Sequence, residues 1–321
     1  MAVLRRWAIV IMGAAVVLAG CGGSGGNGSA AKHPIGDPAI RTAEVVAQAD
    51  SPLDAVPSPD GADIFYLATG DAGPAVYRVP ARGGAVATVT QGGSLTKPTG
   101  IGVAPDGLRL YLADQQAQSN AAPGAVGAIL TVSAMGMPEP LTTLPGTRGR
   151  SPRALDVGSD VIYFTGTDPA NNEPGLFQVP LAGGTVSTVA EGAPITSPDS
   201  VVVTAEGVAY ITDQGAGPGQ GKVFRVSGGN VTPVLANLRL GAPAGLTLIN
   251  NDTTLLVSSI DATSGSDQLL YLDLATGKTA AATKVIGANM NSSGGLHRAF
   301  HASVLAWADV SRSGKVYRVD P

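Results

Sequence analysis

The chain has little cysteine, few aromatic residues and little charge. One cysteine occurs among 321 residues, which excludes a disulfide framework, so the fold must be stable through its apolar core alone. Charged residues make up 14% of the chain and the net charge is −4, so no basic field for nucleic acid is expected. The apolar share is nevertheless 44%, ample for a folded core and too high for a disordered chain.

Glycine and proline, in contrast, are abundant. The chain contains 44 glycines and 23 prolines, which would break the long helices of a coiled coil or a helical bundle. The glycines have no three-residue period, which excludes collagen. This composition favours a fold of short strands and turns.

The first 20 residues are typical of an export signal. Arg5 and Arg6 precede an uncharged apolar run of 13 residues, positions 7–19, which is too short to span a bilayer comfortably. The run ends in Leu-Ala-Gly followed by Cys21, the single cysteine, and this segment resembles a bacterial lipobox. The resemblance implies removal of residues 1–20 and lipidation of Cys21. The alternative is ordinary secretion with an incidental cysteine.

Residues 21–40 are predicted to be a flexible tether. Residues 22–29 read GGSGGNGS, a composition that cannot bury surface. Removing residues 1–20 removes two arginines and no acid, so the mature charge becomes 18 − 24 = −6. We therefore expect an exported domain on a lipid anchor in the bacterial cell envelope, facing the periplasm or the cell surface.

The remaining chain, residues 41–321, repeats one unit. Five prolines and one serine open successive units at spacings of 46, 54, 46, 45 and 50 residues: Pro52, Pro98, Pro152, Pro198, Pro243 and Ser293. Each unit continues with short apolar strands separated by turns such as Pro-Asp-Gly, which is hairpin chemistry. Four strands in about 45 residues predict a propeller blade, and the length accommodates six blades.

The last unit ends without a fourth strand. Residues 41–48, RTAEVVAQ, form a strand-like segment that belongs to no other unit. We expect this segment to complete the last blade and to cover its open sheet edge. The predicted fold is therefore an all-β, six-bladed propeller of four-stranded blades, closed by an N-terminal strand.

Two of the units resemble NHL-type repeats and the wider TolB-like superfamily of six-bladed propellers. The segments that carry the resemblance are PTGIGVAPDGLRLYLAD and SPDSVVVTAEGVAYITDQGAGPGQGKVFRV. The superfamily includes gluconolactonase-like metal enzymes, strictosidine-synthase-like proteins and binding modules. Because these motifs are structural, the resemblance implies the fold and leaves the function open.

Metal enzymes of this superfamily carry oxygen ligands where each innermost strand begins. The matching positions here are Leu53, Thr99, Arg153, Asp199, Ala244 and Gly294. A calcium site needs six or more oxygen ligands, and among these positions only Asp199 supplies a carboxylate. Thr99, Arg153, Asp199 and, from the last unit, His297 are our candidate binding residues at the channel mouth. The alternative for Asp199 is a structural ion pair with Arg153.

Two further groups of residues contain potential metal-binding or acid–base side chains. Asp168, Asn171, Asn172 and Glu173 lie in one loop, but they lack the order of an EF-hand. His297 and His301 would share one strand face, since side chains alternate with period two, and a histidine pair is a potential acid–base or zinc group. Of the two, His297 near the channel mouth is the better functional candidate, and His301 is expected to be packed or solvated. We expect no cofactor, with calcium as the alternative.

Recurring residues favour structural roles. Asp114, Asp213 and Asp309 each end a second strand, where an aspartate accepts hydrogen bonds from the following loop. All seven tyrosines fall on second or third strands, which is typical of packing between blades.

The sequence thus predicts a monomeric binding or scaffolding module with no catalytic residues. Its variable loops, residues 115–125, 166–175, 214–221 and 260–268, are expected to present a surface to a protein, a glycan or a small ligand. The alternative function is a metal-dependent lactonase- or hydrolase-like enzyme using Asp199 and His297, or a lyase-like enzyme.

Overall fold

The computed structural model describes residues 42–117, 126–135, 140–215, 219–261, 263–265, 267–282 and 293–320. Cys21, residues 1–41 and parts of three of the predicted binding loops lie outside the described residues. The described residues form 23 β-strands. No helix among them is long and apolar enough to cross a bilayer.

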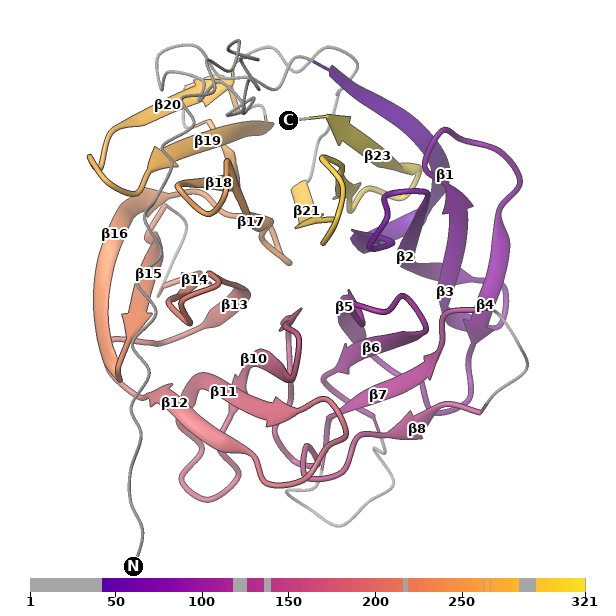
Figure 1. Ribbon diagram of the computed structural model, residues 1–321, viewed down its shortest axis with the longest axis horizontal. Helices are drawn as coiled ribbons and strands as arrows, with labels where there is room; N and C mark the ends of the chain where they lie inside the picture. Colours follow the sequence, from indigo (N-terminus) through magenta and orange to yellow (C-terminus); the bar gives the residue numbers. More distant parts are fainter. Residues whose placement is uncertain are drawn as a thin grey trace, which may run out of the picture. The chain divides into compact units, whose positions relative to one another are not determined.

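The strands form a closed ring of six antiparallel blades, which confirms the predicted fold (Figure 1). Four blades are separate four-stranded sheets, and the fifth sheet has seven strands because two blades share β1 (Thr42–Pro57).

Blades 1 to 3 follow β1 along the chain. Blade 1 adds β2 (Asp63–Gly70), β3 (Gly73–Pro80) and β4 (Ala87–Gln91) to the second half of β1. Blade 2 is β5 (Pro98–Val103), β6 (Arg109–Asp114), β7 (Ala128–Ser133) and β8 (Thr142–Thr143). Blade 3 is β9 (Leu155–Val157), β10 (Val161–Thr167), β11 (Pro174–Pro180) and β12 (Ser187–Glu191).

Blades 4 to 6 complete the ring. Blade 4 is β13 (Pro198–Val203), β14 (Ala209–Asp213), β15 (Gly221–Ser227) and β16 (Asn230–Leu238). Blade 5 is β17 (Leu246–Ile249), β18 (Thr254–Ile260), β19 (Asp267–Asp273) and β20 (Thr279–Ala282). Blade 6 is β21 (Ser293–Arg298), β22 (Leu305–Asp309), β23 (Gly314–Asp320) and the first half of β1.

Strand β1 closes the ring as predicted. Its residues 42–49 pair antiparallel with β23, and its residues 50–57 pair with β2 as the innermost strand of blade 1. Ser51 lies between the two halves with a φ of 50°, in the left-handed region that re-aims a strand. The outer edge of β23, which would otherwise be open to pairing, is thereby covered.

The apolar core lies between the blades. Six clusters of buried side chains fill the six gaps between adjacent sheets. In the gap between blades 5 and 6, Tyr271, Trp307 and Tyr317 pack together. Tyr66, Tyr111 and Tyr210 are buried in three other gaps, which confirms the prediction that the recurring aromatics fill the space between sheets.

The aspartates that end second strands fasten loops, which confirms their predicted structural role. Asp114 accepts hydrogen bonds from the amides of Thr96, Lys97 and Gln116 at 2.7–3.1 Å. Asp213 does the same with the amides of Thr196, Ser197 and Gly215, and Asp309 accepts from the amide of Ser311. Asp114 of blade 2 and Asp213 of blade 4 therefore each connect the loop that follows the second strand with the segment that leads into the innermost strand.

Candidate functional site

A cavity of about 770 Å³ occupies the centre of the ring. It is lined by residues near the ends of the innermost strands β1, β5, β9, β13 and β21, by Leu246 and Thr247 of β17, and by the turns that follow these strands. The turns at its rim include residues 158–160, 204–207, 251–252 and 299–300. The cavity therefore lies toward the end of the channel where the innermost strands finish, opposite the end where they begin.

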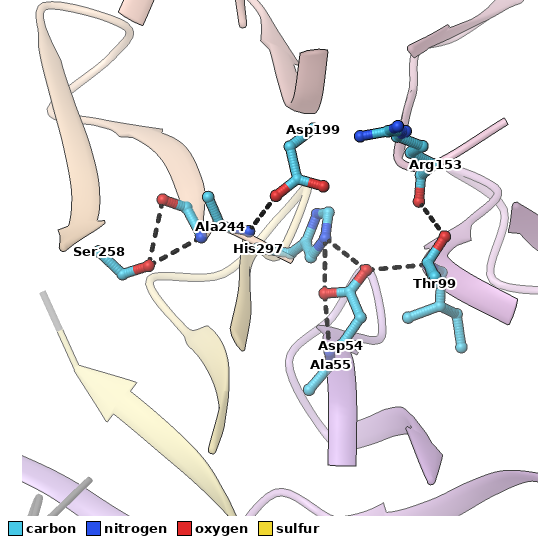
Figure 2. Close-up of polar contacts among 10 residues, drawn as sticks. Asp54, Ala55, Thr99, Arg153, Asp199, Ala244, Ser258 and His297 are labelled. Atoms are coloured by element: carbon cyan, nitrogen blue, oxygen red, sulfur yellow. Dashed lines mark hydrogen bonds and ion pairs between the residues drawn. The ribbon is translucent and has the colours of Figure 1, made fainter. Parts of the chain in front are cut away.

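A buried carboxylate–imidazole pair lies beside this cavity. Figure 2 shows the His297 ring directed at the Asp54 carboxylate, with His297 Nε2 at 3.0 and 3.1 Å from its two oxygens. Asp54 is only 2% exposed and also accepts from the amides of Ala55 and Ile101, each at 2.9 Å. His297 is 9% exposed and lines the cavity. The strands β1, β5 and β21 are thus connected through one carboxylate.

Asp156 lies across the ring from His297. Asp156 pairs with Tyr163 on β10, and His297 pairs with Ala306 on β22. Each of the two is the last residue but one of its innermost strand. Their blades, 3 and 6, are opposite members of a six-bladed ring. Asp156 Oδ2 accepts from the amide of Val203 at 2.7 Å, which connects blade 3 to blade 4.

The third polar group of the cavity is an ion pair between blades 5 and 6. The Arg298 guanidinium pairs with the Asp252 carboxylate and donates to the carbonyl of Leu248 at 3.3 Å. Asp252 also accepts from the amide of Ala205 of blade 4 at 2.9 Å. Polar contacts thus connect most pairs of neighbouring blades around the cavity.

Blades 2 and 3 are connected differently at this level. A Cβ added to Gly102 would lie 2.3 Å from Leu155 Cδ1 and 2.6 Å from Val157 Cγ2. The absence of a side chain at Gly102 therefore lets the two innermost strands approach closely, as glycine permits.

Burial and neighbouring charges shift the pKa values of these groups. Burial by itself would lower the pKa of His297, but the charge and hydrogen bond of Asp54, with a smaller contribution from Asp156, raise it above its usual value. Burial raises the pKa of Asp156, while the Val203 amide, Arg298 and His297 act in the opposite direction. The pKa values of both cavity groups, His297 and Asp156, therefore lie above their usual values.

The candidates from strand beginnings lie at the other end of the channel. Asp199 is buried, accepts from Gln214 Nε2 at 3.0 Å and from the Ala244 amide at 2.7 Å, and burial raises its pKa. Thr99 Oγ1 donates to the carbonyl of Arg153 at 2.7 Å (Figure 2). These residues act between blades 2 to 5, and none of them lines the cavity.

Two expectations about pairs of residues are wrong. Arg153 forms no ion pair with Asp199 among the described residues; its guanidinium donates to Ser197 Oγ at 3.1 Å instead, close enough to act on Asp199 through its charge. His301 does not share a strand face with His297, because β21 ends at Arg298. His301 is exposed in the following turn, and its amide donates to the carbonyl of Pro59.

In the loop at residues 168–173, side-chain oxygens make contacts with neighbouring residues of the protein. Asp168 accepts from the Ala170 amide and pairs with Arg150 at 3.2 Å, and Asn171 Oδ1 accepts from the Glu173 amide. Within the part of the chain that the structure describes, no three His, Cys, Asp or Glu side chains gather as a metal site would require. The described residues of the channel and of this loop therefore do not fit the oxygen-rich ligand set of a calcium ion.

Sequence reasoning identified His297 but missed Asp54, Asp156, Asp252 and Arg298. A signal for two of them is present: Asp54 and Asp156 are carboxylates inside otherwise apolar innermost strands, LDAV and LDV. An ionisable residue in such a strand needs a partner when buried, and this alone would have marked both positions.

Comparisons with known proteins show the fold. No family model matches the chain, and no curated protein sequence matches it. A gluconolactonase from Xanthomonas campestris superposes with a TM-score of 0.62 at 15% identity, covering 90% of this chain and 98% of its own. A putative TolB from Agrobacterium tumefaciens gives 0.58 at 15% identity, covering 88% and 100%. A chain of a nidogen/laminin complex gives 0.56 at 14%, covering 77% and 84%.

Proposed function

We propose that this six-bladed β-propeller, a fold shared with TolB and lactonases, is a binding module whose ligand site is the central cavity. Ligand sites are typically concave, about 300–1,000 Å³ in volume and largely preformed, with a few polar groups that orient the ligand. The cavity of about 770 Å³ lies in this range. Its polar groups are held in place by contacts between blades, so little ordering is needed when a ligand enters.

The observation that carries this proposal is the position of the cavity among six innermost strands that belong to six different blades. Each blade that carries one of these strands packs against an apolar cluster on both of its sides. The cavity wall is therefore rigid, whereas the residues at its rim lie in turns that tolerate sequence change.

A thermal-shift screen with a chemically mixed set of small molecules tests the proposal. Ser159 is exposed at the rim of the cavity, so Ser159→Trp places a large ring there without disturbing the core. Met135 is exposed and outside the cavity, and Met135→Trp is the matched control. We expect hits on wild type and the control that are lost in Ser159→Trp. Hits that persist in both variants would move the site away from the cavity.

The setting of the module is the second part of the proposal. The lipobox-like segment and Cys21 support an exported, lipid-anchored monomer of the bacterial cell envelope with no nucleic-acid partner. Two acyl chains on one cysteine suffice for stable membrane anchoring. We expect wild type to incorporate labelled palmitate and to partition into detergent, and Cys21→Ser to lose both properties. Unchanged partitioning of Cys21→Ser would refute the anchor.

The predicted loops remain candidates for a macromolecular partner. These are the loops at residues 115–125, 166–175, 214–221 and 260–268, whose described parts follow second strands at the end of the ring away from the cavity. A protein or glycan bound there would leave the cavity free. Crosslinking in intact envelopes, compared between wild type and a chain with the 166–175 loop shortened, would detect such a partner.

An enzyme of the lactonase, hydrolase or lyase type is the alternative, and the His297–Asp54 pair favours it. A carboxylate that holds an imidazole is a common arrangement for a general base. The alternative predicts lactone hydrolysis that is lost in His297→Asn and retained in Asp199→Asn, because only His297 lines the cavity. Equal background rates for wild type and His297→Asn would exclude it.

A further inference from the structure

The charges that line the cavity are unbalanced. Four acidic side chains and two basic ones contribute to its wall: Asp156, Asp160, Glu206, Asp252, His297 and Arg298. Arg298 is paired with Asp252, and His297 is paired with Asp54. Among the described residues no Lys, Arg or His lies within ion-pair distance of Asp156, Asp160 or Glu206. The cavity therefore has an excess of uncompensated negative charge.

One oxygen of Asp156 is available to a ligand. Asp156 Oδ2 accepts from the Val203 amide, and no described residue donates to Oδ1. Fully buried polar atoms without a partner are confined, among described side chains, to Thr131 Oγ1 and Ser259 Oγ. Asp156 Oδ1 is consequently open to the cavity, as is the Nδ1 atom of His297 by the same reasoning.

An exposed aromatic ring lies at the rim. Phe300 is 42% exposed, and of the five large apolar side chains that stand exposed in the described chain it alone lines the cavity. The ring extends the apolar surface of the cavity at its rim. The apolar wall below, which includes Val157, Val203 and Leu246, suits a hydrocarbon chain.

Taken together, we propose that the cavity binds a small alkylamine, whose ammonium group donates to Asp156 Oδ1 and whose alkyl chain lies along the apolar wall toward Phe300. This inference rests on the proposed function and specifies its ligand class. An ammonium carries three donors, so it can satisfy Asp156 and a second acceptor at once. A carboxylate or phosphate ligand would be repelled by the same uncompensated negative charge.

The test uses three probes of equal length: hexylamine, hexan-1-ol and hexanoate. Isothermal titration calorimetry and thermal shift are measured on the protein with its anchor cysteine changed to serine. We expect hexylamine to bind most tightly. Asp156→Asn should weaken hexylamine about tenfold or more, because a charge-assisted hydrogen bond is lost. Phe300→Ala should weaken hexylamine by about two- to fivefold, because apolar contact with the alkyl chain is lost.

Asp106→Asn is the matched control, since Asp106 is an exposed carboxylate in a turn at the same end of blade 2 but outside the cavity. It should leave hexylamine binding unchanged. Asn at position 156 still accepts from the Val203 amide, so the blades stay connected, and an unchanged melting temperature without ligand verifies this.

The outcomes separate the two proposals. Binding of hexan-1-ol or hexanoate as tight as that of hexylamine would overturn the amine proposal and leave a binding cavity. Equal weakening of hexylamine binding by Asp106→Asn and Asp156→Asn would overturn the assigned contact. The weakening would then reflect only the loss of one negative charge from the protein. Binding of none of the probes, together with no hit in the mixed screen above, would overturn both proposals.

Discussion

Removing the Asp54 carboxylate is expected to be among the most destabilising single changes in the channel. Asp54→Ala deletes an acceptor that serves three donors: the amides of Ala55 and Ile101 and the ring of His297. Ile101 is fully buried, so water cannot replace the lost acceptor at its amide without opening the gap between blades 1 and 2.

The magnitude follows from these donors. A buried donor left without a partner costs about 1–3 kcal/mol, and breaking a buried charged pair by removing one partner costs about 3–5 kcal/mol. We therefore expect Asp54→Ala to lower the free energy of unfolding by about 3–5 kcal/mol. Asp54→Asn retains one acceptor oxygen and should cost less, about 1–2 kcal/mol.

A surface pair in the same blade supplies the control. Asp63 pairs with Arg78 at 2.7 Å, with side chains 20% and 38% exposed. Exposed ion pairs contribute about 0–1 kcal/mol, so Asp63→Ala should change the free energy of unfolding by less than about 1 kcal/mol. The two substitutions remove the same group and differ in burial.

Urea unfolding followed by tryptophan fluorescence measures both variants. The chain has two tryptophans, and cleavage before Cys21 would leave only Trp307, which is buried in blade 6 and donates to Ser293 Oγ at 3.1 Å. The denaturant slope should stay constant, so that midpoints report stability. Equal midpoints for Asp54→Ala and Asp63→Ala would refute the reasoning that burial makes this carboxylate important.

Three further predictions concern pH, ring closure and close packing. Because the folded-state pKa of His297 is raised, the stability that its ionisation contributes is complete below about pH 6.5 and is lost as pH rises through the folded-state pKa. In urea unfolding from about pH 5.5 to about pH 8.5, wild type should show this decline and His297→Asn should lack it. An identical pH profile in both proteins would contradict the prediction. Deleting residues 22–38 should leave the melting temperature nearly unchanged, whereas deleting residues 22–49 removes the strand that pairs with β23 and should lower it by more than about 10 °C; equal melting by calorimetry would argue against closure. Gly102→Ala should cost about 1–3 kcal/mol in urea unfolding, because its Cβ would overlap Leu155 and Val157, and a cost below about 0.5 kcal/mol would show that the strands can separate.

Much of the fold was predictable because a blade is a local structure. Its strands are neighbours in sequence and are joined by turns with recognisable signals such as Pro-Asp-Gly. The spacing of the prolines gives the length of the repeat. The closing role of β1 was also predictable, since the last unit lacked a strand and the first segment had no partner. The structural roles of the aspartates at strand ends and of the tyrosines were predictable because these residues recur at the same position in several units.

The site was less predictable, because its residues recur in no other unit. Reasoning from strand beginnings led to Thr99, Arg153 and Asp199, which connect blades away from the cavity. His301 was assigned to a strand that ends three residues before it. The predicted ion pair of Arg153 failed because a hydroxyl, Ser197 Oγ, takes its guanidinium, and no sequence pattern distinguishes these two partners.

The repeat, the number of blades and the closing strand could be inferred from the amino-acid sequence, because each depends on residues close together in the chain or on a simple count. The tertiary structure alone decided which end of the channel is hollow and which charged groups meet there. Asp54 and His297 are 243 positions apart, and only closure of the ring brings the first and last blades into contact. A pairing of that kind depends on the geometry of the whole ring, which no local pattern in the sequence encodes.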